Sequence, residues 1–176
     1  MMKIKITKFK DLKIIYSPIH RDRRGYFREI YQKKILKQKF LFTCVSSSKK
    51  NVLRGLHLQR KFAQGKYLSV LKGEIYDVAV DLRKNSKSFG KYFSIKLSEK
   101  NGISIYLPPG FAHGFVGLKE ENILSYQCTE YRSVKNEVGI IWNDKDLKIK
   151  WPLKNPVLSF KDKKNISFKK YLKYYA

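Results

Sequence analysis

The feature that most constrains the fold is a series of short segments in which apolar and polar residues alternate, separated by glycine and proline. Residues 66–82 contain two such segments joined at Lys72-Gly73, and residues 102–117 contain a strand that Pro108-Pro109-Gly110 stops and that resumes after His113. Residues 122–131 contain another. Many short strands at close intervals predict an all-β chain that folds as an antiparallel sandwich or barrel.

Helical patterns are few. Residues 29–40 could form one short helix that begins at Glu29. Near the end of the chain, the spacing of Phe168, Tyr171, Leu172 and Tyr175 predicts a helix docked on the barrel. The same mixture of lysine and aromatic residues would also suit a helix on a membrane surface. Because the 176 residues show no linker or repeat, we expect a single domain spanning 1–176.

The formal net charge of +25 raises the possibility of a nucleic-acid-binding protein. The basic residues, however, are 31 Lys and only 8 Arg, and they are spread along the whole chain. Arginine is the residue that favours bidentate recognition of bases and phosphates. A solvated, lysine-rich surface is therefore the favoured interpretation, and a basic nucleic-acid-binding module is kept as the non-enzymatic alternative.

The sequence predicts a cytoplasmic protein with no membrane partner. Lysines interrupt the apolar residues of the opening stretch MMKIKITKFK, unlike a signal peptide, and no apolar run reaches membrane-spanning length. Cys44 and Cys128 lack the spacing of metal ligands and could form at most one disulfide. We expect both to be reduced in the cytoplasm.

Two motifs indicate the type of barrel. The spacing of glycine, proline and histidine from Gly102 to His113 resembles the second motif of the cupin barrels. The first cupin motif carries a His-x-His pair, whereas this chain has His57-Leu58-Gln59. Catalytic metal sites of this kind generally need three protein ligands, and the remaining His20 lies in an arginine-rich stretch. We therefore expect no metal and no cofactor, which leaves the histidines available for proton transfer.

Several motifs in order make the resemblance more specific. RGLH, PPGFAHGF, a Y-x-x-T-x-Y segment and GI-x-WND ahead of WP together resemble the dTDP-4-dehydrorhamnose 3,5-epimerases, a family of metal-free cupins. RRGYFREIY and VLSFKD also match. The motifs span residues 54–57, 108–115, 126–131, 139–144 and 151–152, and the similarity extends from about 17 to 162. The implied fold is a cupin barrel, that is, a double-stranded β-helix or jelly roll, with a few short peripheral helices.

The resemblance implies a set of catalytic residues. Epimerisation next to a ketone needs a base on one face of the sugar, an acid on the other, and a cation for the enolate oxygen. By analogy His57 is the base, Asp162 orients its ring, Tyr126 is the acid and Lys66 stabilises the oxygen. The residues alone leave other roles open: a core aromatic for the tyrosine, a solvated cation for the lysine and a surface turn for the aspartate.

A second pair is expected to support the site. Asp77 shares a predicted strand face with apolar Ile75 and Ala79, so a buried carboxylate there requires a partner. The resemblance places Asp77 with His113 in the group that lines the barrel.

The substrate-binding residues follow from the same resemblance. The fork of Arg54 suits the diphosphate of a nucleotide sugar, although a rim ion pair is the alternative. In the family, residues corresponding to Arg24, Phe27 and Glu29 come partly from the neighbouring subunit, which implies a homodimer. Further expected substrate-binding residues are Gln59, Ser46 and Tyr131.

One departure from the family leaves the nucleotide open. Ahead of VLRGLH the family commonly has Q-x-N-x-S-x-S, whereas this chain has Phe42, Cys44, Ser46 and Ser48. Each lost amide hydrogen bond is worth about 0.5 to 1.5 kcal/mol. Leu58 also replaces an aromatic residue of the family motif, a smaller change.

The expected function is that of a cofactor-independent 3,5-epimerase of a nucleotide-linked 4-keto-6-deoxy sugar. A single-site epimerase at C3 or C5, or a 3,4-ketoisomerase, on a dTDP- or GDP-linked sugar is the alternative. The pairing of His57 with Tyr126 favours epimerisation, because a proton shuttle on one face would not need the tyrosine. Whether the sugar is a hexose or a heptose stays open.

Overall fold

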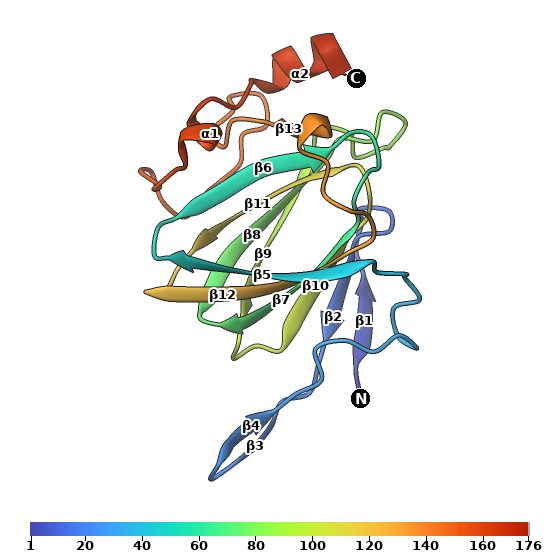
Figure 1. Cartoon of the computed structure of the whole chain (residues 1–176), viewed down its shortest axis with the longest axis vertical. Coiled ribbons are helices and arrows are strands. Elements are labelled where there is room, and N and C mark those ends of the chain that lie inside the picture. Colours follow the sequence, from blue (N-terminus) through green and yellow to red (C-terminus); the bar gives the residue numbers. More distant parts are fainter. Residues whose placement is uncertain (176) are drawn as a thin grey trace.

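The structure, a computed structural model, describes residues 1–175 and is built from two facing antiparallel sheets (Figure 1). One sheet has the strand order β1-β2-β10-β7-β12-β5 and the other has the order β13-β6-β11-β8-β9. The first sheet contains β1 (Lys3–Ile6), β2 (Lys13–Tyr16), β10 (Ile103–Leu107), β7 (Lys66–Lys72), β12 (Glu121–Cys128) and β5 (Phe42–Lys49). The second contains β13 (Glu137–Gly139), β6 (Leu53–Gln59), β11 (Phe111–Gly117), β8 (Glu74–Asp81) and β9 (Tyr92–Ser98). The predicted all-β barrel is confirmed.

Alternation along the strands divides the apolar residues among three layers. The layer between the sheets includes Leu68, Ile75 and Ala79, together with Phe9, Leu12, Val70, Leu97, Ile105, Leu107, Phe111, Phe115 and Leu124. On β8, Val78 and Val80 point the other way, into a layer on the outer side of the second sheet. Asp77 therefore shares the inner face with Ile75 and Ala79, as the alternation predicts.

Two short helices and one 3-10 turn lie outside the strands. They are α1 (Phe160–Lys163), α2 (Phe168–Tyr175) and η1 (Val134–Asn136). The predicted C-terminal helix is confirmed: Phe168 and Tyr171 are buried in the outer layer of the second sheet, with Val78, Val80 and Leu147. Among residues 1–175, no helix is long and apolar enough to cross a membrane.

The predicted helix at residues 29–40 is wrong, because this segment forms turns and loops on the outer side of the first sheet. The rings of Tyr31 and Phe40 have centroids 5.4 Å apart, whereas residues nine positions apart in a helix are separated by about 13 Å. Leu36 is buried there with Tyr67 and Tyr106. Burial of these aromatic residues against the sheet outweighs the local helical pattern.

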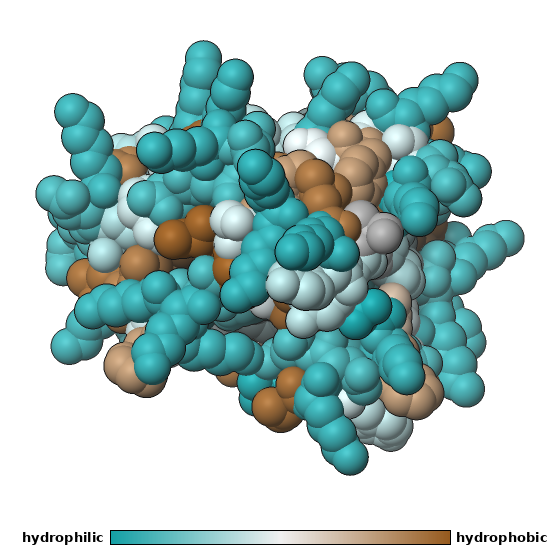
Figure 2. Space-filling model, turned by 90° about the horizontal axis from the view of Figure 1, so that it is seen from above, coloured by the Kyte–Doolittle hydropathy of each residue, from teal (hydrophilic) through white to brown (hydrophobic). Residues whose placement is uncertain are grey.

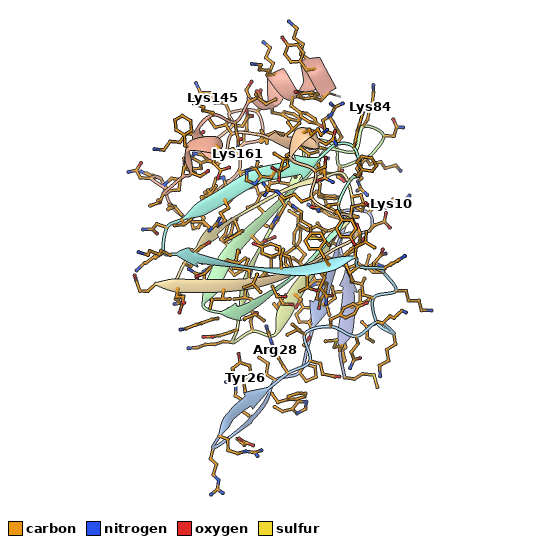
Figure 3. The ribbon with its side chains drawn as sticks, in the orientation of Figure 1. Lys10, Tyr26, Arg28, Lys84, Lys145 and Lys161 are labelled. Carbon is orange, nitrogen blue, oxygen red and sulfur yellow. The ribbon has the colours of Figure 1, made fainter. Side chains whose placement is uncertain are left out.

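A hairpin of β3 (His20–Asp22) and β4 (Gly25–Phe27) projects away from the barrel (Figure 1). Figure 3 labels Tyr26 at the base of the hairpin, where its hydroxyl lies 3.5 Å from the carbonyl oxygen of Leu71 on β7. The side chain of Phe27 is 66% exposed. In the single chain, the hairpin thus leaves the aromatic side chain of Phe27 exposed to solvent.

The glycine of the RGLH motif brings two strands together. Gly55 has φ +122°, and a Cβ atom there would lie 2.5 Å from Gly114 Cα and 2.7 Å from the carbonyl oxygen of His113. This close approach sets β6 against β11 so that His57 pairs with His113. The strand after the proline turn starts at Phe111 rather than after His113, which places that histidine in the middle of β11.

The surface fits the interpretation of lysine as a solvating residue. Figure 2, seen from above the barrel, shows hydrophilic side chains over most of the face with small apolar patches between them. Leu172 of α2 is among the exposed large apolar residues.

Candidate active site

A pocket of about 610 Å³ lies between the two sheets, and all four residues predicted to be catalytic line it: His57, Lys66, Tyr126 and Asp162. Its lining comprises Ser46, Val52, Leu53, Arg54, His57, Lys66, His113, Phe115, Tyr126, Arg132, Glu137, Val157, Leu158, Ser159, Lys161 and Asp162. A larger hollow of about 1060 Å³ lies along residues 31–43 and Gln127. Its described lining holds lysines but no histidine or carboxylate, so the acid-base chemistry belongs to the smaller pocket.

The two sheets supply different groups to this pocket. His57 and His113 come from β6 and β11 of the second sheet. Lys66, Tyr126 and Ser46 come from β7, β12 and β5 of the first sheet. Imidazole and phenol therefore reach one cavity from opposing walls.

His57 is paired with a buried carboxylate. Its Nε2 atom lies 2.5 Å from Oδ1 of Asp162, and the side chains of the two residues are 27% and 4% exposed. Ser159 donates to Oδ2 of Asp162 over 2.9 Å. Although burial opposes it, the hydrogen bond and the electrostatic interaction with His57 hold the pKa of Asp162 below its usual value. With Nε2–H donating to this carboxylate, Nδ1 is the ring atom that accepts a proton.

A second histidine and aspartate pair lies deeper in the wall. His113 Nε2 is 2.7 Å from Oδ2 of Asp77, and both side chains are buried. The other oxygen of Asp77, Oδ1, has no hydrogen-bond partner within residues 1–175. The ring of His113 stacks on Phe115, with centroids 6.2 Å apart. The partner that a carboxylate requires at this position is thus His113.

The environment of Tyr126 keeps its phenol protonated. Its hydroxyl oxygen lies 3.1 Å from Oγ of Ser46. Burial raises the pKa of Tyr126 well above its usual range, and the contact with Ser46 offsets only part of this. At neutral pH the group is a neutral O–H donor inside the pocket.

Lys66 begins β7 and lies opposite Cys128 in the ladder. Burial lowers the pKa of Lys66, an effect that nearby thiols and carboxyl groups oppose. Its position in the pocket lining rules out the interpretation of this residue as a solvated surface lysine. Both cysteines have free thiols in the structure.

Arg54 lies at the mouth of the pocket with part of its fork engaged. Its Nε donates to Oγ of Ser48 over 2.9 Å, and one terminal nitrogen donates to the carbonyl oxygen of Ser47 over 3.0 Å. Within residues 1–175 the guanidinium has neutral partners and no acidic one. The rim ion pair considered from the sequence is therefore not formed in this part of the chain, and the positive charge is uncompensated there.

Other predicted binding residues lie apart from these groups. Arg24 is on the projecting hairpin, where it is paired with Asp22 at 2.6 Å, and Phe27 ends strand β4 of the same hairpin. Glu29 follows the hairpin, where its carboxylate accepts from the amide of Gln32. Gln59 is buried, with its amide nitrogen donating to the carbonyl oxygens of Phe62 and Tyr131 and its oxygen accepting from the backbone N–H of Ser133. Tyr131 itself stacks on Phe42 with an interplanar angle of 9°.

The structure adds residues that sequence reasoning missed. Glu137 accepts both from the fork of Arg132, at 3.1 and 3.2 Å, and from Lys161 at 2.5 Å. Burial works against ionisation, but these two cations lower the pKa of Glu137 to about 2. No motif distinguishes these residues in the sequence, because each is one of many charged residues in a lysine-rich chain.

Within residues 1–175, no group of three or more His, Cys, Asp or Glu side chains is placed to hold a metal ion. The polar groups of the pocket are instead two imidazoles, a phenol, carboxylates and cations. Such groups can remove, hold and return protons and can bind an anionic ligand.

Known proteins are similar to this chain over most of its length. A family model described as dTDP-4-dehydrorhamnose 3,5-epimerase matches residues 6–170. The dTDP-4-dehydrorhamnose 3,5-epimerase of Methanothermobacter thermautotrophicus is 44% identical over 158 residues, which cover 85% of each chain. That of Salmonella typhimurium is 42% identical over 170 residues, covering 92% of this chain and 93% of the relative.

Solved structures give the same result. The crystal structure of dTDP-4-dehydrorhamnose 3,5-epimerase from Elizabethkingia anophelis has a TM-score of 0.89 and 42% identity, covering 96% of this chain and 97% of that chain. The dTDP-6-deoxy-D-glucose-3,5-epimerase from Legionella pneumophila, in complex with dTDP-4-keto-L-rhamnose, has a TM-score of 0.90 and 40% identity, covering 96% and 94%. The predicted jelly-roll fold is thereby confirmed. This chain belongs to the dTDP-4-dehydrorhamnose 3,5-epimerase family.

Proposed function

We propose that this chain, as a single cupin-type domain, is a cofactor-independent 3,5-epimerase of a nucleotide-linked 4-keto-6-deoxy sugar. The observation that carries the proposal is that His57 and Tyr126 line one pocket from opposing sheets. The similar Legionella enzyme, with dTDP-4-keto-L-rhamnose bound, supports a dTDP-linked sugar as the first ligand to test.

In the proposed reaction, Nδ1 of His57 removes the proton from the carbon next to the C4 ketone. The electron pair of the broken C–H bond moves onto the ketone oxygen, and the ammonium of Lys66 stabilises the enolate. Asp162 stabilises the imidazolium through its hydrogen bond to Nε2. Tyr126 then donates its phenolic proton to the same carbon from the opposite face, which inverts the configuration. C3 and C5 both flank the ketone and can react in this way.

The buried phenol favours epimerisation over 3,4-ketoisomerisation. A ketoisomerase moves a proton along one face of the sugar and needs no acid on the other side. Here the raised pKa of Tyr126 keeps a proton available on the wall opposite His57. A single-site epimerase would use the same two residues, so the number of carbons that react has to be measured.

The binding of the nucleotide is proposed to involve Arg54 and a second copy of the chain. The uncompensated fork of Arg54 at the pocket mouth suits a diphosphate. Arg24, Phe27 and Glu29 lie on or next to the hairpin that projects from its own barrel, where the exposed Phe27 ring has no covering layer within residues 1–175. We therefore propose a homodimer in which the hairpin of each subunit reaches the pocket of the other. The cytoplasmic location remains a prediction.

The test of the activity is to incubate the protein with dTDP-4-keto-6-deoxyglucose in deuterated water and to follow the proton signals at C3 and C5. Washout at both positions is expected. Washout at one position would identify a single-site enzyme, and movement of the carbonyl to C3 would identify a ketoisomerase. An absence of any exchange would contradict the proposal. A GDP-linked 4-keto sugar in a parallel reaction decides which nucleotide is accepted.

The test of the homodimer is complementation. A chain with His57→Asn and a chain with Phe27→Ala are each expected to be weak alone, because one lacks the base and the other lacks a partner contact. Mixing them should restore activity, since one of the two pockets in a mixed dimer is intact. No recovery on mixing, with dimers present, would contradict exchange of the hairpin between subunits.

A further inference from the structure

Three charged side chains form a chain of ion pairs along the rim of the pocket. Glu137 lies between Arg132, at 3.1 Å from Nε, and Lys161, at 2.5 Å from Nζ. The carboxylate is only 16% exposed, whereas the lysine is 52% exposed. Since the planar fork of Arg132 binds both oxygens of Glu137, the carboxylate is held in one orientation before it meets Lys161.

The Glu137 and Lys161 pair connects the two segments that carry the catalytic pair. Glu137 starts β13, which pairs with β6, and Gly139 of β13 lies directly opposite His57. Lys161 is on α1, one residue before Asp162. Figure 3 labels Lys161 beside α1 and above β6. The ion pair therefore connects β13, which pairs with the strand of His57, to α1, which carries Asp162.

Lys161 and Asp162 lie in the segment that runs from residue 157 to residue 166. Its backbone is anchored at Val157, which exchanges hydrogen bonds with Asn51 and Leu53, and again at Ile166, which bonds to Gly139 and Ile141. Between these anchors α1 has only four residues, and so short a helix gains little stability from its own hydrogen bonds. The position of Asp162 thus depends on side-chain contacts made by residues 158–165.

The side chains that supply such contacts differ in kind. Nδ2 of Asn165 lies 3.4 Å from both Oδ1 of Asp162 and the carbonyl oxygen of Gly55, and its amide packs on Gly139 of β13, where an added Cβ atom would lie 2.0 Å from Oδ1 of Asn165. Ser159 belongs to the same segment as Asp162 and so cannot fix it to the barrel. Lys161 makes the short, charge-assisted contact to a neighbouring strand.

An ion pair with a half-exposed lysine adds little to the free energy of unfolding. The ion pair can instead matter for the position of α1, because a displacement of about 1 Å far from the reacting atoms can lower a rate about a hundredfold. We propose that Glu137 is a positioning residue, which holds α1 through Lys161 so that Asp162 meets His57. The kinetic part of this inference rests on the proposed epimerase function.

The kinetic experiment compares the rate of deuterium washout in four variants. Glu137→Gln, which keeps the shape of the side chain, is expected to lower kcat between about tenfold and a hundredfold. Lys161→Met should do the same, and the double variant should lose no more than either single one, since both remove one interaction. Lys161→Arg should stay within about threefold of the unaltered protein because it keeps a cation at that position.

The matched control is Glu121→Gln. Glu121 accepts from Lys72 at 2.5 Å in an exposed ion pair at the far end of β12. The chemical change is the same, and kcat is expected to be unaltered. The melting temperatures of Glu137→Gln and Glu121→Gln should each lie within about 4 °C of the unaltered protein. A normal kcat in Glu137→Gln, or independent losses that multiply in the double variant, would overturn the proposal.

A readout without substrate separates this inference from the proposed function. The Nε2–H proton of His57, hydrogen-bonded to Asp162, is expected to give a downfield proton NMR signal, which the loss of the signal in His57→Asn would identify. This signal is expected to broaden or vanish in Glu137→Gln and to stay sharp in Glu121→Gln. If the unaltered protein shows no washout, the proposed function fails and this signal still decides the positioning role. An unchanged signal in Glu137→Gln would overturn it.

Discussion

The molecule contains the same chemical pair, a histidine and an aspartate, in two different settings. His113 and Asp77 lie on neighbouring strands of one sheet, β11 and β8, and both are buried. His57 lies on β6, but its partner Asp162 comes from α1, and the ring of His57 is 27% exposed to the pocket. The first pair is fixed by the sheet ladder, whereas the second is assembled from two separate segments and remains accessible.

This difference indicates that the two pairs have different roles, one in proton transfer and one in the structure of the sheet. A general base must reach its substrate and must keep its ring oriented. His57 meets both requirements, because Asp162 binds Nε2 and the ring remains accessible from the pocket. His113 is held on the inner wall, where its bond to Asp77 satisfies a buried carboxylate. Substitutions in the His57 and Asp162 pair are therefore expected to lower activity, whereas substitutions in the His113 and Asp77 pair are expected to affect mainly stability.

Replacement of the two histidines is expected to give the largest contrast. His57→Asn should abolish deuterium exchange at both carbons, with a loss of about a thousandfold or more, because a general base contributes about 10² to 10⁴ to the rate. His113→Asn should retain exchange within about tenfold, since the amide can still donate to Asp77. Rate constants from proton NMR check both. Equal losses would contradict this difference in roles.

Replacement of the two aspartates should separate activity from stability. Asp162→Asn is expected to lower the exchange rate about a hundredfold while the protein stays folded, because the imidazolium loses its counterion. Asp77→Asn is expected to destabilise the fold by about 1 to 3 kcal/mol, the cost of disturbing a buried hydrogen bond, with a smaller effect on rate. Urea unfolding and exchange kinetics on both variants provide the measurements. A more destabilised Asp162→Asn would reverse the assignment.

Removal of the hydrogen bond between Ser159 and Asp162 is expected to lower the exchange rate less than replacement of Asp162 itself. Ser159 donates to Asp162 and accepts from its backbone N–H, so it fixes the carboxylate that belongs to the pocket. Ser159→Ala is expected to lower the exchange rate about fivefold, which corresponds to one hydrogen bond of about 1 kcal/mol. Ser48→Ala, a change of the same size next to Arg54, is the matched control and should act on KM instead.

The smallest effect concerns the pH dependence of stability. The folded pKa of Asp162 lies below its ordinary value of 3.8, so its ionised form stabilises the folded state. This contribution is complete at pH values above the unfolded pKa and is lost as the pH falls through the folded pKa. The difference in unfolding free energy between the unaltered protein and Asp162→Asn should be constant above about pH 5 and should shrink at lower pH. A difference that grows on acidification would contradict this.

The sequence predicts the strands well because alternation records burial directly. Asp77 among apolar residues of β8 indicated a buried carboxylate with a partner, and the spacing of Phe168 and Tyr171 indicated a docked helix. The segment at 29–40 misled because a helical spacing is also compatible with a loop whose aromatic residues, Tyr31 and Phe40, meet across a turn. Local patterns cannot tell these cases apart.

The site was predictable only in part, since its members come from distant segments. The residues next to Asp162 in the sequence suggest an aspartate in a surface turn. Only the resemblance to the family paired it with His57, which is 105 residues away in the sequence. Gln59 shows another limit of local patterns: they do not reveal that its amide bonds to backbone groups of Phe62, Tyr131 and Ser133. Glu137 was missed because its importance lies in which strand and helix it connects.

The central claim is that a base and an acid act on one sugar from opposing walls, and Tyr126→Phe tests it most directly. In deuterated water this variant is expected still to exchange protons at C3 or C5, because His57 is intact, while the configuration of the recovered sugar stays that of the substrate. Proton couplings of the product give the configuration. Normal inversion by Tyr126→Phe would contradict the claim.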